Sequence, residues 1–146
     1  MPLCVRYLSR KSISEKYLKN IADRCLNSMR RKNAEIDLVF IGKKRMRDLN
    51  RIYRKKDRVT DVLSFGNECD KKTRFVSPKL ANQNLGEIFI CMERAKAQAE
   101  EKGHSLKKEV AILLIHGILH LLGFDHEKDA DFKVMQELEK KLIAGL

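Results

Sequence analysis

The chain has 146 residues, of which 43% are hydrophobic and 35% are charged, and this globular mix excludes wholesale disorder. No apolar run approaches the roughly 18–20 residues of a membrane span, which excludes a membrane-spanning helix. Lys and Arg number 31 against 20 Asp and Glu, a net charge of +11, which favours nucleic acid as a partner and, second, an anionic membrane surface. A chain of this length can bury a core without disulfides, so we expect one domain over residues 1–146.

Strands alternate with helices in the first half of the chain. Alternating apolar residues predict strands, and apolar residues that recur every three or four positions predict helices. These patterns give strands over 3–8, 36–41 and 61–65 and helices over 12–31 and 44–53. Capping-box spacing that starts at Ser12 is expected to begin the first helix. The second helix is expected to bury Met46, Leu49 and either Ile52 or Tyr53.

Helices follow one another in the second half of the chain. A region without any period, 66–84, is predicted to be a long exposed loop. A strand over 85–91 follows it, and then helices over 92–102, 105–122 and 129–143. The last helix is expected to bury Phe132, Met135, Leu138 and Leu142. We therefore predict an α+β fold, a small mixed four-stranded sheet packed with about five helices.

The cysteines give no sign of a disulfide framework or a zinc site. They are widely spaced and include no C-x-x-C pair: Cys4, Cys25, Cys69 and Cys91. Buried or free thiols in a reducing compartment are therefore expected. The first fourteen residues are basic and hold no acid, but 3–8 alternates well enough to be a strand. We therefore predict no targeting segment and a cytoplasmic location.

Three of the four histidines fall within eleven residues, in the segment His116-Gly-Ile-Leu-His120-Leu-Leu-Gly123-Phe-Asp-His126. His116 and His120 are four apart in a helix, so they share one face about 6 Å apart along its axis and can reach one metal ion. Gly123 suits the end of that helix, after which the chain can turn back and bring His126 to the same ion. Three protein ligands leave a fourth position for water, as in catalytic sites.

The ligand set favours one Zn²⁺ per chain, at the end of the central helix, although other divalent transition metals also suit three imidazoles. A pair of unpartnered histidines in so apolar a helix would cost stability, which argues against a purely structural reading of the segment. The fourth histidine, His104, lies between Gly103 and Ser105 in a predicted loop. We assign it no functional role.

The spacing H-x-x-x-H-x-x-G-x-x-H is that of the metzincin zinc peptidases, with one decisive difference. Those enzymes carry Glu directly after the first histidine as general base, and this chain has Gly117 there. Glycine cannot take a proton from water or deliver one to a leaving amine. Together with the positive charge, this favours phosphodiesters over peptides as substrates, with the metal activating water and arginine offsetting the added negative charge.

The histidine segment 116–126 resembles the signature of the YbeY family of metal-dependent endoribonucleases, which act in ribosomal RNA maturation. Two further segments are similar to family blocks. They are Leu49-Asn-Arg-Ile-Tyr-Arg-Lys-Lys-Asp-Arg-Val-Thr-Asp-Val-Leu-Ser-Phe65 and Leu85-Gly-Glu-Ile-Phe-Ile90. The three segments occur in the family's order and cover a bit under a third of the chain. Gly66 stands where the family often has proline, and Glu87 where aspartate is common.

The resemblance implies that His116, His120 and His126 bind the metal. It also implies a functional role for Arg54, which would contact phosphate through its planar guanidinium and stabilise the charge of the transition state. From the sequence alone, the basic run around Arg54 reads more simply as a solvated charged face. Its other members, Lys55, Lys56 and Arg58, are expected to bind RNA electrostatically.

The implied function is hydrolysis of RNA phosphodiesters in ribosomal RNA processing, maturation and ribosome quality control. Expected partners are RNA, above all ribosomal RNA, and ribosome-associated proteins, with no DNA and no membrane. Two alternatives remain open at this point. One is a zinc-stabilised assembly factor that binds RNA or the ribosome without catalysis. The other is a metzincin-like metallopeptidase that uses a distant acid as base, with Glu87 or Glu127 as the candidates.

Overall fold

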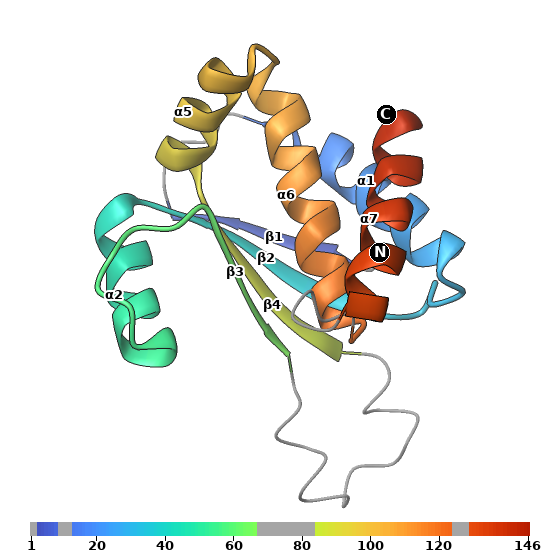
Figure 1. Ribbon diagram of the computed structural model, residues 1–146, viewed down its shortest axis with the longest axis horizontal. Coiled ribbons are helices and arrows are strands. Elements are labelled where there is room, and N and C mark those ends of the chain that lie inside the picture. The colour runs from blue at the N-terminus through green and yellow to red at the C-terminus, as the bar shows by residue number, and fades with distance from the viewer. Residues whose placement is uncertain (1–2, 9–12, 67–83, 124–128) are drawn as a thin grey trace, which may run out of the picture.

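The computed structural model describes residues 3–8, 13–66, 84–123 and 129–146, and for 129–132 the backbone alone. It contains a four-stranded sheet and helices on both of its faces (Figure 1). The strands are β1 (Leu3–Tyr7), β2 (Glu35–Ile41), β3 (Val62–Gly66) and β4 (Asn84–Cys91). The helices are α1 (Glu15–Ser28), α2 (Lys43–Arg54), α5 (Met92–Lys102), α6 (Leu106–Leu121) and α7 (Asp129–Ala144). The predicted α+β fold is confirmed.

The sheet is mixed, with strand order β1-β2-β4-β3. The first three strands in that order run parallel, while β3 pairs with β4 in the antiparallel sense and forms an edge of the sheet. On β4, Ile88 has Leu38 of β2 as its neighbour on one side and Ser64 of β3 on the other. Near the start of β4, Gly86 has a φ of +133°, and a Cβ there would lie 2.1 Å from the carbonyl oxygen of Phe65. Only glycine fits this close approach.

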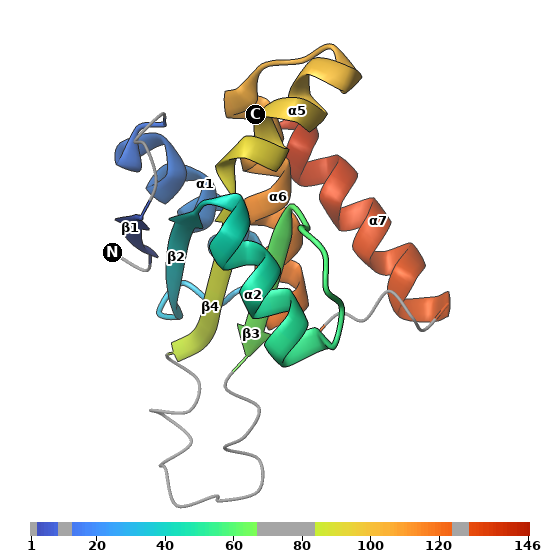
Figure 2. The ribbon, with the colours of Figure 1, turned by 90° about the vertical axis from the view of Figure 1, so that its left-hand side faces the viewer.

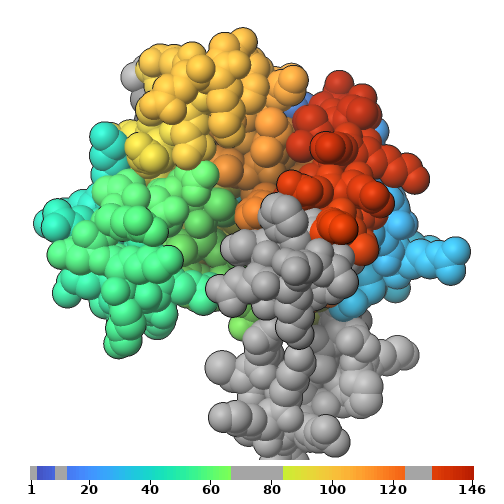
Figure 3. Space-filling view, in the orientation of Figure 1, coloured from blue at the N-terminus to red at the C-terminus, as the bar shows by residue number. Residues whose placement is uncertain are grey.

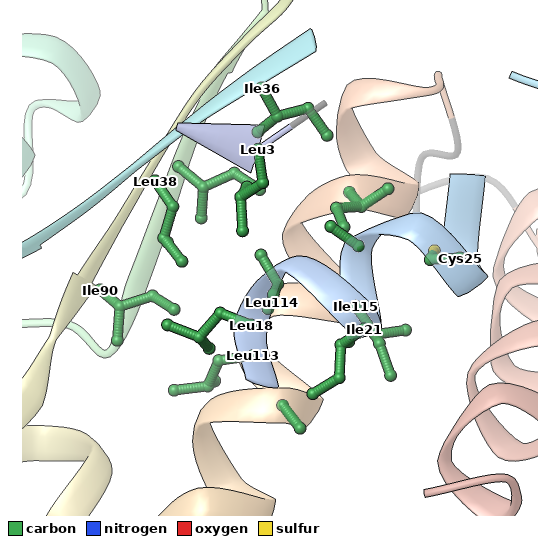
Figure 4. Packing of buried hydrophobic residues seen from close by; sticks show 14 of the residues in the cluster. Leu3, Leu18, Ile21, Cys25, Ile36, Leu38, Ile90, Leu113, Leu114 and Ile115 are labelled. Atoms are coloured by element: carbon green, nitrogen blue, oxygen red, sulfur yellow. The ribbon is translucent and has the colours of Figure 1, made fainter. Parts of the chain in front are cut away.

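The two faces of the sheet bury separate hydrophobic clusters. Because side chains alternate along a strand, neighbouring residues of β2 point into different clusters. Leu38 and Phe40 belong to the larger cluster, together with residues of α1 and α6, whereas Val39 and Ile41 join Met46 of α2 on the opposite face. Figure 2 shows α2 on the near face of the sheet, and Figure 4 shows the larger cluster from close by.

Helix α6 lies at the centre of the larger cluster and passes very close to β4. Its N-cap, Ser105, accepts a hydrogen bond from the backbone N–H of Lys108 at 3.1 Å, so the helix begins within one residue of its predicted start. Gly117 is buried, and a Cβ on it would lie 2.9 Å from Cδ1 of Ile88. Glycine at this position therefore allows the helix to pack directly against the strand and fixes the height of α6 over the sheet.

The first helix is shorter than predicted at both ends. It begins at Glu15 after an N-cap at Ser14, whose side chain makes no capping hydrogen bond, rather than at Ser12. It ends at Ser28 because Arg30 takes a left-handed conformation with φ 58°, and the N–H of Arg31 then bonds to the carbonyl oxygen of Leu26 at 2.8 Å. This is the usual closing pattern of a helix, with arginine in place of the glycine that would have marked it in the sequence.

The predicted burial of Ile52 or Tyr53 is wrong. Their exposed fractions are 52% and 62%, whereas Asn50 is 3% exposed. The buried side of α2 is set by Met46 and by Asn50, one helical turn later, whose Nδ2 donates a 2.9 Å hydrogen bond to the carbonyl oxygen of Arg58. Leu49 is partly buried, as predicted, and the hydrogen-bonded amide of Asn50 completes the buried side of α2, so that Ile52 and Tyr53 lie on its exposed side.

Several other predictions can be compared with the described residues. Met135 is buried, and Leu138 and Leu142 are partly buried, as expected for the last helix. The side chain of Phe132, and Cys69 with most of the predicted loop 66–84, lie outside the described residues. Cys25 and Cys91 are buried thiols, and Cys4 is an exposed one. Among the described segments, no helix has the length and apolar character needed to cross a membrane.

Candidate metal centre

A cleft of about 500 Å³ opens where α6 passes the edge strand β3. Its walls come from the second half of α6, from β3, and from the end of α2 with the segment that follows it. Figure 3 shows atoms of α6 (orange) at the surface between that segment (green) and α7 (red). The residues that line the cleft are Asn50, Arg54, Lys56, Arg58, Thr60, Val62, Leu63, Ser64, His116, Gly117 and His120.

The two helical histidines face each other in this cleft. Their Nε2 atoms are 3.0 Å apart and their ring centroids 4.5 Å apart. Two nitrogens bound to one tetrahedral zinc ion at roughly 2.0–2.1 Å would lie about 3.3 Å apart. The distance between the two Nε2 atoms is therefore already close to the one that a bound zinc ion would require. Imidazole nitrogens are also donors that zinc and related divalent metals prefer, so His116 and His120 fit the predicted metal.

The third predicted ligand, His126, lies outside the described residues, as do Asp125 and Glu127. Within the described segments, no group of three or more His, Cys, Asp and Glu side chains could hold a metal ion. The structure therefore describes the positions of two of the three predicted ligands, and metal binding by all three histidines stays a prediction. Helix α6 does end as the sequence indicates: Leu122 is its C-cap and Gly123 has a φ of +102°.

A carboxylate of the C-terminal helix contacts one of the two histidines. Oε1 of Glu139 on α7 lies 2.7 Å from Nδ1 of His116. The Glu139 side chain is 22% exposed and that of His116 is 36% exposed. No sequence prediction involved Glu139, which is 23 residues further along the chain than His116. The helical repeat that puts Met135 in the core also puts Glu139, one turn later, on the same side of α7, and that was the available signal.

Arg54 reaches the same cleft from the last turn of α2. Its Nη2 donates a 2.7 Å hydrogen bond to the carbonyl oxygen of Ser64 on β3. Its guanidinium carbon lies 5.0 Å from the centre of the Phe65 ring, within the range of a cation–π contact. Phe65 in turn packs edge-on against Tyr53. The arginine is thus exposed but held by a carbonyl and a ring on the edge strand.

The basic residues after Arg54 divide into two groups. Lys56 and Arg58 line the cleft, whereas Lys55 does not. Lys55 is the C-cap of α2, in a left-handed conformation with φ 60°. The following turn is fixed by Asp57, which accepts two hydrogen bonds from Arg47, at 2.8 and 3.3 Å. The hydrogen bonds and charge of Arg47 lower the pKa of the Asp57 carboxyl below its usual value.

A second polar cluster lies at the other end of α6, and it stabilises the fold. Glu109 is fully buried, and its Oε1 is 2.8 Å from Nε2 of His104 and 3.2 Å from Nζ of Lys102. His104 thus has a structural partner that the sequence did not indicate, since a loop histidine and a helical glutamate five residues apart carry no local signature. The cluster joins the end of α5 to the start of α6.

The structure also bears on the peptidase alternative. The position after the first histidine, Gly117, faces Ile88 of β4 at a distance that leaves no room for a glutamate along that direction. Glu87, one candidate for a distant base, is exposed and does not line the cleft. The other candidate, Glu127, lies outside the described residues. The described part of the cleft therefore offers arginine, lysine and histidine, which suit an anionic substrate.

The sequence and the fold match one family of known proteins. The profile of the family described as Endoribonuclease YbeY matches residues 6–146. The Endoribonuclease YbeY of Sulfurihydrogenibium sp. (strain YO3AOP1) is 42% identical over 137 residues, which cover 93% of this chain and 86% of that protein. The Endoribonuclease YbeY of Phytoplasma australiense is 41% identical over 118 residues, which cover 81% of this chain and 78% of that protein.

A solved structure agrees with this relationship. The solution structure of TM1509 from Thermotoga maritima is similar with a TM-score of 0.61 and 29% sequence identity, covering 96% of this chain and 87% of that one. The predicted family and the predicted enzyme class are confirmed: the chain belongs to the YbeY family of endoribonucleases.

Proposed function

We propose that this protein is a metal-dependent endoribonuclease that hydrolyses RNA phosphodiesters in the processing and maturation of ribosomal RNA and in ribosome quality control. Residues 1–146 would act as one hydrolase domain in the cytoplasm. The observation that supports this best is the shared cleft. One wall carries the facing imidazoles of His116 and His120, and the other carries Arg54 with Lys56 and Arg58.

In this proposal His116, His120 and His126 hold one Zn²⁺ or a related divalent metal. When bound, the metal would polarise a phosphoryl oxygen and activate a water molecule. The Nε2 atoms of His116 and His120 are the donors that face each other across 3.0 Å. His126 follows three residues after Gly123 in the sequence, where the chain leaves α6.

Arg54 would stabilise the negative charge that builds up on the phosphate. Its guanidinium has five N–H donors, and the contact with Ser64 uses one of the terminal nitrogens. The contacts with Ser64 and the Phe65 ring hold the group at the cleft before RNA arrives. Such preorganised charge lowers the barrier because little reorganisation is needed during the reaction.

The basic residues around the cleft would bind the RNA backbone. Lys56 and Arg58 line the cleft, and Lys55 lies exposed beside them. Contacts to phosphate give affinity without sequence preference and weaken as salt rises. Ribosomal RNA and ribosome-associated proteins are the proposed partners. In this proposal the net charge of +11 supplies the long-range attraction that brings the protein to RNA.

The test is cleavage of ribosomal RNA fragments by purified wild-type protein loaded with zinc, beside His116→Ala, Arg54→Ala and the control Arg45→Ala. Arg45 is an exposed arginine on α2 that does not line the cleft. We expect wild type and Arg45→Ala to cleave, and the other two to be severely impaired. Equal cleavage by all four proteins would identify a contaminant and refute the proposal. Tight RNA binding with no cleavage by the wild type would favour the non-catalytic assembly factor.

A further inference from the structure

The contact between Glu139 and His116 links the predicted metal site to a helix that supplies none of the predicted ligands. Helix α7 is held against the larger core by Met135, which is 2% exposed, and by Leu138 and Leu142. Glu139 follows Met135 by one helical turn, and its Oε1 lies 2.7 Å from Nδ1 of His116. The packing of α7 therefore determines where the carboxylate stands.

The chemistry of this contact is directional. A carboxylate can only accept a hydrogen bond, so Nδ1 of His116 must carry the hydrogen that lies between the two side chains. The lone pair of a neutral imidazole is then on Nε2. That atom is the one that faces Nε2 of His120 at 3.0 Å. A metal ligand needs its lone pair on the coordinating nitrogen, so the contact leaves His116 in the form that binds a metal.

The geometry points to Glu139 as a positioning residue of the metal site, which fixes the tautomer and the ring orientation of His116. This inference rests on the metal proposed above. In metalloproteins, loss of such a carboxylate beyond the ligands costs about 10–100-fold in metal affinity. His116 and Glu139 also flank, in the sequence, the segment that contains His126. The contact thus links α6 and α7, the two helices on either side of His126 in the sequence.

The first experiment reads the tautomer without any metal. In protein labelled with ¹⁵N at the histidine rings, the Nδ1 and Nε2 shifts of His116 are compared between wild type, Glu139→Ala and Glu137→Ala. Glu137 is exposed on the same helix and is the matched control. We expect the proton on Nδ1 in wild type and in Glu137→Ala, and a mixture of tautomers in Glu139→Ala. A wild-type His116 with its proton on Nε2 would overturn the inference.

The second experiment measures zinc affinity by competition with a chromophoric chelator. We expect Glu139→Ala to bind zinc about 10–100-fold more weakly than wild type, and Glu137→Ala to match wild type. Should Glu139→Ala fail to fold, Glu139→Gln replaces it, because an amide can donate as well as accept and no longer dictates the tautomer. A Glu139 variant that melts at a lower temperature but keeps the wild-type tautomer and zinc affinity would show that Glu139 only stabilises the fold. That result would overturn the inference.

The two readouts separate this inference from the proposed function. If wild-type protein binds no zinc, the proposed metal fails whatever the ring shifts show. If wild type binds zinc and cleaves RNA but Glu139→Ala keeps both the wild-type tautomer and the wild-type affinity, the proposed function stands and the role of Glu139 is refuted.

Discussion

Nη2 of Arg54 donates a 2.7 Å hydrogen bond to the carbonyl oxygen of Ser64, ten residues later on the edge strand β3. This contact ties the end of α2 to the strand that forms one wall of the cleft. The guanidinium is also 5.0 Å from the centre of the Phe65 ring. An exposed arginine with such fixed partners is suited to meet an anion without first losing conformational freedom.

Replacement of Arg54 should therefore affect chemistry far more than folding. We expect Arg54→Ala to lower the rate of RNA cleavage by about 10²–10³-fold, the usual cost of removing one preorganised donor to a transition state. Its free energy of unfolding should change by only about 0.5 kcal/mol, because the side chain is exposed. Single-turnover kinetics and urea unfolding check the two expectations. A rate loss matched by an equal loss in Arg45→Ala would contradict a specific role.

The close approach of Gly117 to Ile88 predicts a coupling between these two residues. A Cβ at 117 would lie 2.9 Å from Cδ1 and 3.0 Å from Cγ2 of Ile88. We expect Gly117→Ala to reduce the free energy of unfolding by about 1 kcal/mol, because overpacking outweighs the better helix propensity of alanine.

Ile88→Val removes Cδ1 and should make Gly117→Ala less costly. Urea unfolding of the single and double variants gives the coupling energy, which we expect to be at least about 0.5 kcal/mol. If the effects of Gly117→Ala and Ile88→Val simply add, α6 and β4 would be shown to move apart at little cost at this point. Gly42→Ala is the control, since its Cβ would lie 3.7 Å from Oε1 of Glu93, an ordinary contact distance.

The buried carboxylate of Glu109 should be important for stability and irrelevant to RNA cleavage. Glu109→Ala removes the partner of His104 and Lys102 and leaves a void at the start of α6. We expect a loss of about 2–4 kcal/mol in the free energy of unfolding. Lys102→Ala should cost less than about 1 kcal/mol, because the Lys102 side chain is 54% exposed. Equal losses in the two variants, measured by denaturant unfolding, would contradict this account of the cluster.

The cysteines should differ sharply in reactivity. Burial raises the pKa of the Cys25 thiol to about 12 and also raises the pKa of Cys91. The thiolate is the reactive form, so at pH 8 only about one in 10⁴ buried Cys25 side chains would be ionised. We expect iodoacetamide at pH 8 to modify Cys4, which is exposed, and to spare Cys25 and Cys91 until the protein unfolds. Mass spectrometry of peptides measures this, and modification of Cys25 as fast as Cys4 would refute it.

Local signals in the sequence were sufficient for much of the fold and for the relative placement of His116 and His120. Helical period and strand alternation predicted the four strands and five helices found in the described residues, because each pattern depends on residues within a few positions. His116 and His120 face each other because a spacing of four fixes their relation within one helix. The predicted basic run at the end of α2 lines the cleft with Arg54, Lys56 and Arg58.

Features that depend on contacts between distant residues could not be predicted in the same way. The bond from Glu139 to His116 requires knowing how α7 packs on α6, and the role of Asn50 requires knowing where the carbonyl oxygen of Arg58 lies. The early end of α1 depends on Arg30 adopting a left-handed conformation that sequence patterns associate with glycine. Tertiary packing determines such details, so composition and periodicity do not predict them.

The dependence of RNA cleavage on metal is tested by a titration of metal-free protein with Zn²⁺ in which bound metal and RNA cleavage are measured on the same samples. We expect cleavage to be absent at the start, to rise in proportion to bound zinc, and to saturate at one ion per chain. Protein with His116 and His120 both replaced by alanine should bind no zinc at this site and cleave no RNA. Full cleavage by metal-free wild-type protein, or by the double variant, would contradict the account.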